Sequence, residues 1–355
     1  MKRQNILSFI IFALLIIPFL FNIFNSGEEG YFWGLWDAIT LFIVNVGGVL
    51  IFLSIFHNTK FCSKDFSVYK LIWLQELFII LGIFGSIMGV TTLIVNLEVP
   101  PPPGVDPLAS LISNMAVCSL ALIYGFFGAI ITYMVQKYNE LQPIINDTAN
   151  IEQPKEGFKL LSCIYFIIYI LINVLALAIL SADSGGIFVF PFESVYYIGI
   201  ISIILILFYR GNSLFRLLKN MFWYVSDTKS NINYNLKFIR NVKKILAMII
   251  FVSLLCAPIM MLIVLTIPPQ ESTILELDFN FLSFSGLKHG GIQFFWILTT
   301  IILLTIIEGR EVTKLYYLTG KISSGDRFFS IKYVLGPMFL MLFIFIIGII
   351  QSLLF

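Results

Sequence analysis

The sequence has few charged residues. Only 12% of its 355 residues are Asp, Glu, Lys or Arg, whereas roughly a quarter are charged in soluble domains. Hydrophobic residues make up 59% of the chain, and the mean hydropathy is +0.96. The formal net charge is only +2 and no Lys/Arg-rich tract is present, so we expect no nucleic-acid partner. This composition predicts an all-α, polytopic membrane protein with the lipid bilayer as its surroundings.

Histidine and cysteine are also scarce, which bears on metal, redox and catalytic chemistry. We predict the two histidines, His57 and His289, on opposite sides of the membrane. The four cysteines lack metal-ligand spacing and fall in an inner loop or within helices: Cys62, Cys118, Cys163 and Cys256. We therefore expect no disulfide framework, no metal and no other cofactor. We also expect no enzyme activity, because no catalytic constellation converges at one depth, and Glu308 beside Arg310 is expected to form an interfacial ion pair.

Long apolar runs are what the chain has in abundance. A bilayer core of about 30 Å needs roughly 20 apolar residues per helix, and about nine such stretches are present. They lie near 5–25, 35–56, 74–97, 108–136, 158–181, 194–210, 241–267, 290–309 and 333–355. With a cytoplasmic N-terminus, 21 of the 22 basic residues fall on the inner side and only Lys288 lies outside. Because Lys and Arg are retained in cytoplasmic segments, this asymmetry supports both the helix count and the orientation.

Two segments of the chain share features of a tandem repeat. "LIVNLEVPPPPG" at 93–104 and "LIVLTIPPQE" at 262–271 begin alike and both reach a Pro pair. They suggest parallel four-helix units at 1–140 and 158–315, with a cytoplasmic linker at 141–157 and an inner loop plus ninth helix at 316–355. Recurrence of prolines at outer membrane loops explains the same features, so both interpretations stay open.

Small residues recur at helical spacing on two consecutive predicted helices. Gly82, Gly85, Ser86 and Gly89 lie on one face of the first helix, at steps of three and four. The matching stripe on the second helix consists of Asn114, Cys118, Ala121, Gly125 and Gly128. Close helix packing explains many such stripes. Their polarity also fits a surface that receives another helix, with water or an ion nearby.

These stripes resemble a known family of membrane proteins. "FGSIMGVTTLIVN" followed by "LASLISNMAVCSLALIYGFFGAIITYMV" resembles the third and fourth helices of the MotA/TolQ/ExbB proton channel family, and "WDAITLFIVNVGGVLIFL" resembles its second helix. The resemblance covers roughly residues 30–136. It implies a subunit of a rotary motor in the bacterial inner membrane, forming a homo-oligomer, a pentamer, around single-helix partners of the MotB/TolR/ExbD type.

The resemblance also implies where the translocated ion is bound. Residues facing the pore or partner helix would be the two stripes together with Leu122. Ser86, Ala121 and Leu122 are similar in position to sites where sodium-using relatives carry hydroxyls, and only Ser86 keeps one. Protons rather than sodium are therefore expected. Because Glu76 is predicted near the inner end of its helix, we expect a partner helix to supply the titrating Asp.

Other features depart from the family or suggest other functions. The segment between the second and third helices is too short for the cytoplasmic domain of flagellar relatives, and the longest inner segment, roughly 211–240, is amphipathic.

A secondary transporter built from parallel repeats is the alternative, although such a protein should carry its own midplane charges or broken helices. Of these features we note Pro258 and Pro337 within the seventh and ninth predicted helices. A passive membrane scaffold is the third alternative.

Overall fold

The computed structural model describes residues 38–56, 64–97, 107–141, 157–183, 227–265 and 272–320, together with 201, 219, 223–224 and 336. This part of the chain is almost entirely helical. The exception is a two-stranded antiparallel pair between β1 (Gly157–Phe158) and β2 (Trp223–Tyr224). The predicted helical membrane class is therefore confirmed in its coarse form. The predicted helices at 5–25, 194–210 and 333–355 lie outside the described residues, apart from Ile201 and Gly336.

Three segments are long and apolar enough to cross a bilayer. They are Phe66–Thr91 with 26 residues, Ser119–Tyr138 with 20 and Ile292–Thr319 with 28. Shorter apolar helical segments cover Phe42–Phe56 and Leu160–Leu175. All five fall within or overlap predicted spans. The total of nine spans and the cytoplasmic N-terminus stay predictions.

The first described helical run contains a π-helical turn. α3 (Ala38–Leu41) continues into η1 (Phe42–Val46) and then into α4 (Gly47–Phe56). The backbone N–H of Gly47 donates to the carbonyl oxygen of Phe42, which is the wide spacing of a π turn. The run ends at the residue predicted from sequence, while its middle carries a bulge that hydropathy does not indicate.

The next three helices match the predicted spans closely at one end each. α5 (Lys64–Leu97) ends where predicted but begins ten residues earlier than 74. α6 (Pro107–Leu141) begins at a proline, a favoured first helical residue because its missing N–H would have no partner there. α7 (Leu160–Asp183) is shifted by two residues from the predicted fifth span at 158–181. Hydropathy marks the apolar middle of a helix and not the polar turns that continue it.

The last two described helices are longer than predicted. α10 (Lys229–Leu265) and α11 (Ser272–Thr319) have 37 and 48 residues, against predicted spans of 241–267 and 290–309. Residues 229–240 and 272–289, which we expected in an inner segment and an outer loop, are helical. Neither stretch contains proline, so nothing in the backbone stops the helix. At 1.5 Å per residue the two helices are about 55 and 72 Å long, well beyond the bilayer core.

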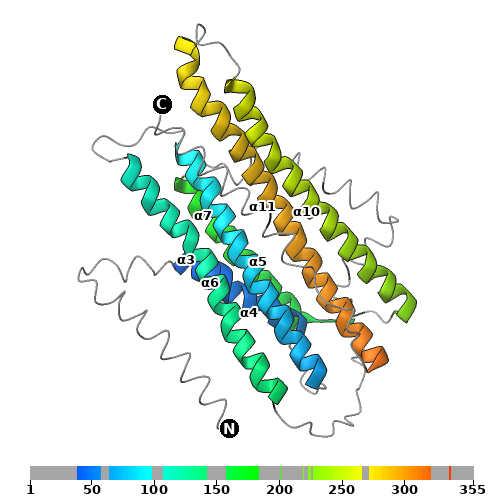
Figure 1. Cartoon of the computed structure of the whole chain (residues 1–355). Helices are drawn as coiled ribbons and strands as arrows, with labels where there is room; N and C mark the ends of the chain where they lie inside the picture. The colour runs from blue at the N-terminus through cyan, green and yellow to red at the C-terminus, as the bar shows by residue number, and fades with distance from the viewer. Residues whose placement is uncertain are drawn as a thin grey trace, which may run out of the picture.

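The helices pack as two long pairs joined side by side (Figure 1). α5 packs along α6, α10 packs along α11, and α11 also packs against α5, while α4 packs against α7. One hydrophobic core includes residues from α4, α5, α7, α10 and α11. Helices assigned to both predicted four-helix units thus share a core, and the repeat itself stays a prediction.

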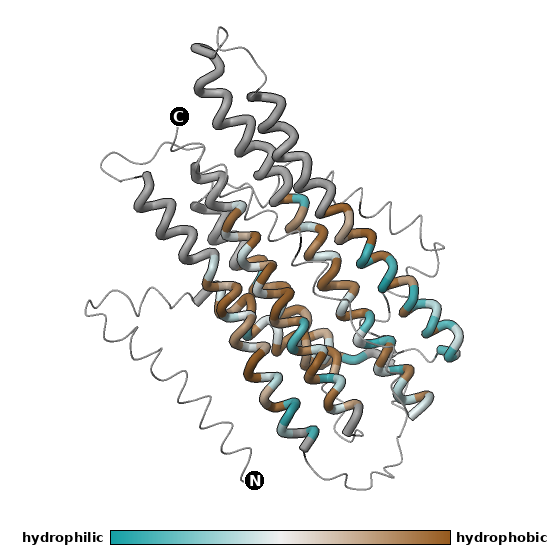
Figure 2. Tube along the Cα trace, in the orientation of Figure 1, coloured by the Kyte–Doolittle hydropathy of each residue, from teal (hydrophilic) through white to brown (hydrophobic). Residues whose placement is uncertain are grey.

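Aromatic side chains pack against one another where α5 contacts α11 and where α5 contacts α4. The Phe66 ring stacks on the Tyr316 ring with centroids 4.1 Å apart, and the Phe56 ring contacts the Trp73 ring edge-on at 5.4 Å. Hydropathy along the chain is highest in the middle of the pairs, whereas hydrophilic residues concentrate on the lower half of α10 and the lower ends of α5 and α6 (Figure 2). Hydrophilic residues therefore gather toward one end of the two helix pairs.

Candidate ion-translocation site

The predicted small residues bring the backbones of α5 and α6 into contact. A Cβ atom added to Gly125 would lie 2.7 Å from the carbonyl oxygen of Phe78 and 2.9 Å from the Cα of Gly82. A Cβ added to Gly82 would lie 2.9 Å from the carbonyl oxygen of Ala121. Such distances leave no room for any side chain, so the two glycines are what allow α5 and α6 to approach closely.

The other predicted site residues surround this contact. A Cβ on Gly85 would lie 2.9 Å from the Ala121 Cβ, so these two residues also meet across the pair. Ser86 and Ala121 are buried, and Gly89 and Leu122 are half-buried. Asn114 and Cys118 belong to α6, and their side chains lie outside the described part of the structure. Gly82, Gly85, Ala121 and Gly125 thus serve packing within one chain, and the role of the stripes toward a partner helix stays a prediction.

The π turn adds a polar residue that sequence reasoning missed. Gly128 faces both Asn45 and Phe78, since a Cβ there would lie 3.0 Å from the Asn45 Oδ1 and 2.9 Å from the Phe78 ring. Asn45 belongs to η1. π turns often occur at functional sites because they redirect side chains. Asn45 therefore adds a polar side chain beside the α5–α6 contact.

A buried ion network connects α10 to α11. The Arg240 Nε donates to the Glu308 Oε1 at 2.7 Å, and the Lys243 ammonium donates to the other Glu308 oxygen. Lys243 and Glu308 have no solvent-exposed side-chain surface, whereas Arg240 keeps 23% of its side chain exposed. Lys243 also donates to the Thr305 Oγ1 at 3.3 Å. Both carboxylate oxygens of Glu308 are thus paired with cations, which offsets the cost of burying it.

Glu76 of α5 brings a third helix to this network. It lies close enough to Lys243 and Glu308 to interact with both electrostatically. Sequence reasoning did not bring these two carboxylates together. The depth of Glu76 and Glu308 in the membrane and the absence of enzyme activity stay predictions.

A second group of charges lies one turn further along α11. Lys314 donates to Glu311 at 2.9 Å and lies 3.7 Å from an oxygen of Asp227. The other Glu311 oxygen accepts a hydrogen bond from Asn235 at 3.0 Å. Glu311 and Lys314 are both buried. The charged groups thus form a chain along the α10–α11 interface.

Arg310 does not pair with Glu308, which corrects the predicted ion pair. Residues two apart on a helix point to different sides, and the Arg310 guanidinium instead donates to the carbonyl oxygen of Ser54 in α4 at 2.6 Å. Lys159, which directly precedes α7, lies near it. Burial, together with the positive charges of Arg310 and Lys314, lowers the pKa of Lys159 to about 8.

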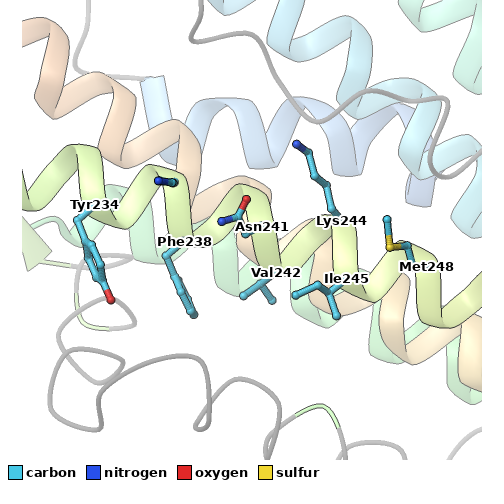
Figure 3. A pocket seen from close by; sticks show the side chains of 8 residues that line it. Tyr234, Phe238, Asn241, Val242, Lys244, Ile245 and Met248 are labelled. Carbon is cyan, nitrogen blue, oxygen red and sulfur yellow. The ribbon is translucent and has the colours of Figure 1, made fainter.

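A groove of about 520 Å³ follows the other side of α10. Its described lining residues all belong to this helix: Tyr234, Lys237, Phe238, Asn241, Val242, Lys244, Ile245 and Met248 (Figure 3). Lys237 and Lys244 are exposed. The groove mixes basic and apolar side chains, as expected of a helix surface near lipid headgroups.

The ion pairs described above place ionisable side chains inside the helical core of the protein. Over the described ranges, no group of three or more His, Cys, Asp or Glu residues is placed to hold a metal ion. Buried carboxylates paired with cations can bind and release protons when that pairing changes. Comparisons with protein-family models, with curated proteins and with solved structures gave no match.

Proposed function

We propose that this chain is an ion-channel subunit of a proton-driven rotary motor of the MotA/TolQ/ExbB type in the bacterial inner membrane. The subunit assembles as a homo-oligomer, a pentamer, around single-helix partners of the MotB/TolR/ExbD type. The observation that carries the proposal is the backbone contact of α5 and α6 at Gly82 and Gly125, on the segment that resembles the family. Two helices in such contact form a thin, stiff wall of the kind a multi-subunit pore needs.

The outer side of α6 supports the same proposal. Over its described side chains this helix exposes large apolar residues in nearly every turn: Ile123, Phe126, Phe127, Ile130, Ile131 and Val135. An apolar surface of this kind can contact lipid or a neighbouring subunit. In a ring of subunits, the α6 surface would form part of the contact between copies.

Proton passage in this assembly depends on a titrating group. An Asp from the partner helix is the expected carrier, and Glu76 together with Glu308 adds ionisable groups that belong to the chain itself. Intramembrane carboxylates are costly and mark ion pathways in pumps and transporters. This buried network favours a second candidate function, a proton-coupled transporter that needs no partner Asp.

One pair of measurements separates the two candidates. The mass of the assembly in mild detergent, measured by native mass spectrometry, should equal five copies of the chain. Proton flux into liposomes under a pH gradient should be low for the chain alone and should rise when the partner is co-reconstituted. A monomer or dimer that carries protons without a partner, with the flux abolished by Glu308→Gln, would reject the motor and support the transporter.

The flux measurement needs a matched control for the charge change. Glu140→Gln removes a carboxylate from a partly exposed ion pair with Lys137 at the end of α6. The proton flux of Glu140→Gln should equal that of the unmodified chain for either candidate function. A decrease as large as that of Glu308→Gln would mean that charge removal acts through insertion or folding rather than through the buried network.

A further inference from the structure

α10 changes from polar to apolar partway along its length. Residues 229–244 include five basic residues and no acidic one, whereas residues 245–265 include no charged residue. This change falls where hydropathy predicts the start of a span, near 241. A membrane helix with such a pattern passes from the lipid headgroups into the hydrocarbon at its last charges. We therefore expect Lys244, the last charged residue of α10, at the depth of the headgroups.

Two of these basic residues carry charge that the described residues do not neutralise. Arg240 and Lys243 pair with Glu308 on the side of α10 that packs against α11. Lys237 and Lys244 are exposed, and neither forms a hydrogen bond or an ion pair with the described part of the chain. Because two helical turns separate them, both lie on one face of α10, about 10 Å apart along the axis. This face therefore presents two positive charges at a fixed spacing.

The groove along α10 lies on the same face. Its volume of about 520 Å³ is within the roughly 300–1,000 Å³ of small-molecule sites. Asn241 lies between the two lysines, is exposed and forms no hydrogen bond with a described residue. Figure 3 shows the Lys244 side chain extending from one edge of the helix and the Phe238 and Ile245 side chains from the other. The groove therefore has a charged edge and an apolar edge.

We propose that this groove binds an anionic phospholipid, with its phosphate between Lys237 and Lys244 and its acyl chains directed along α10 past Met248. Lysine ammonium groups attract anionic headgroups at the membrane surface, and the Asn241 amide can donate to a phosphate oxygen. Met248 is 60% exposed and belongs to the stretch without charges, so it suits contact with an acyl chain. A soluble phosphate compound would leave the apolar edge in contact with water. The site is separate from the proposed ion translocation.

The test uses the full chain in mild detergent, with substitutions that each remove one positive charge. Lys237→Gln, Lys244→Gln and the double variant change the groove. Lys229→Gln is the matched control, because Lys229 is an exposed lysine of the same helix and is not among the described residues that line the groove. Native mass spectrometry measures the apparent affinities for phosphatidylglycerol and for the neutral lipid phosphatidylcholine. Competition by glycerol 1-phosphate tests the headgroup without its acyl chains.

We expect the unmodified chain to bind phosphatidylglycerol more tightly than phosphatidylcholine. Each single variant should weaken phosphatidylglycerol binding about fivefold, the size of one attraction between a lysine and an anionic headgroup. The double variant should weaken it about 25-fold if the two effects add. Lys229→Gln should change it less than twofold, and no variant should change phosphatidylcholine binding more than twofold. The unfolding midpoint without lipid should stay the same, because the substituted lysines are exposed.

Three results would overturn the proposal. The first is equal affinity of the unmodified chain for the two lipids, or phosphatidylglycerol binding by the double variant within twofold of the unmodified chain. The second is a loss in Lys229→Gln as large as in Lys244→Gln, since overall charge and not the groove would then attract the lipid. The third is displacement of the lipid by an equal concentration of glycerol 1-phosphate, which would assign the groove to a soluble phosphate compound.

Discussion

The two long helix pairs of this protein are held together by different kinds of contact between their helices. In the α5–α6 pair, Gly82 and Gly125 remove side chains until the two backbones touch. In the α10–α11 pair, Arg240, Lys243 and Glu308 fill the interface with charges that neutralise one another. Lipid tails are as apolar as leucine, so hydrophobic side chains alone give membrane helices little reason to associate. Close backbone contact and polar pairing are the two alternatives. Among the described residues, backbone contact characterises the α5–α6 pair and charge pairing the α10–α11 pair.

The two interfaces also differ in what each can contribute to function. An interface of glycines has one preferred geometry, because small residues fit only when the helices are at a fixed distance. An interface of ionisable groups can change its charge, and with it the strength of the contact. The α5–α6 pair is therefore suited to hold its shape, whereas the strength of the α10–α11 contact depends on the charges of Arg240, Lys243 and Glu308.

The largest expected effect is on the charged pair. Glu308→Leu leaves Lys243 buried without its counter-charge, and it should lower the free energy of unfolding by about 3–5 kcal/mol. Denaturant unfolding in micelles measures the change. The double variant Lys243→Met with Glu308→Leu should recover part of it, because the fully buried ammonium is then removed as well, whereas Arg240 keeps 23% of its side chain exposed to water. A double variant as unstable as the single one would mean that the ion pair is not what makes Glu308 important.

The next effect is on the glycine pair. Gly125→Ala should lower the free energy of unfolding by about 1–3 kcal/mol, because the new Cβ meets backbone atoms that cannot move without separating the helices. Gly309→Ala is the matched control. Its Cβ would lie 3.3 Å from the end of the Ile55 side chain, which can shift, so we expect little loss. The same unfolding measurement applies, and equal losses at both positions would contradict backbone contact as the cause.

A smaller effect separates hydrogen bonding from charge within the α10–α11 pair. Thr305→Val keeps the shape of the side chain and removes the oxygen that accepts from Lys243, so stability should fall by about 1 kcal/mol. Thr313 is also buried and donates to a carbonyl oxygen of its own helix. Thr313→Val should cost less than Thr305→Val. If the two variants are equal, the Lys243 contact contributes nothing beyond the local bond.

The smallest effect should come from an ion pair outside both interfaces. Lys137 and Glu140 pair at 2.7 Å on the exposed end of α6, with 47% and 34% of their side chains exposed. Water screens such a pair, so Lys137→Gln should leave the thermal midpoint unchanged. A clear decrease would mean that this end of α6 is covered in the assembled protein, which would support a contact between subunits there.

Several features of the fold followed from the sequence because they depend on local chemistry. The apolar runs predicted helices, and α5 and α4 end at the predicted residues, where apolar stretches give way to polar ones. The glycine stripes left close helix packing open as one of two interpretations, since steps of three and four place residues on one helix face. Such patterns depend on residues that are close together in the sequence. They do not determine which helix packs against which stripe.

The candidate site was only partly predictable for the same reason. Glu76, Lys243 and Glu308 are far apart in the chain, and each taken alone resembles a residue at a membrane boundary. Only the packing of α5, α10 and α11 brings them near one another and removes Lys243 and Glu308 from water. The partner of Arg310 was predicted wrongly because Glu308 is its neighbour in sequence, whereas the turn of the helix directs the two side chains to different elements.

The sequence by itself determined that this is a helical membrane protein, where its apolar segments lie and which positions are free of side chains, because hydropathy and helical periodicity act over neighbouring residues. The tertiary structure decided that the two glycine stripes meet each other and that charges of α10 and α11 form a buried network with Glu76 of α5 near it. Burial and pairing of charges depend on distances through space, and those distances exist only once the helices have packed.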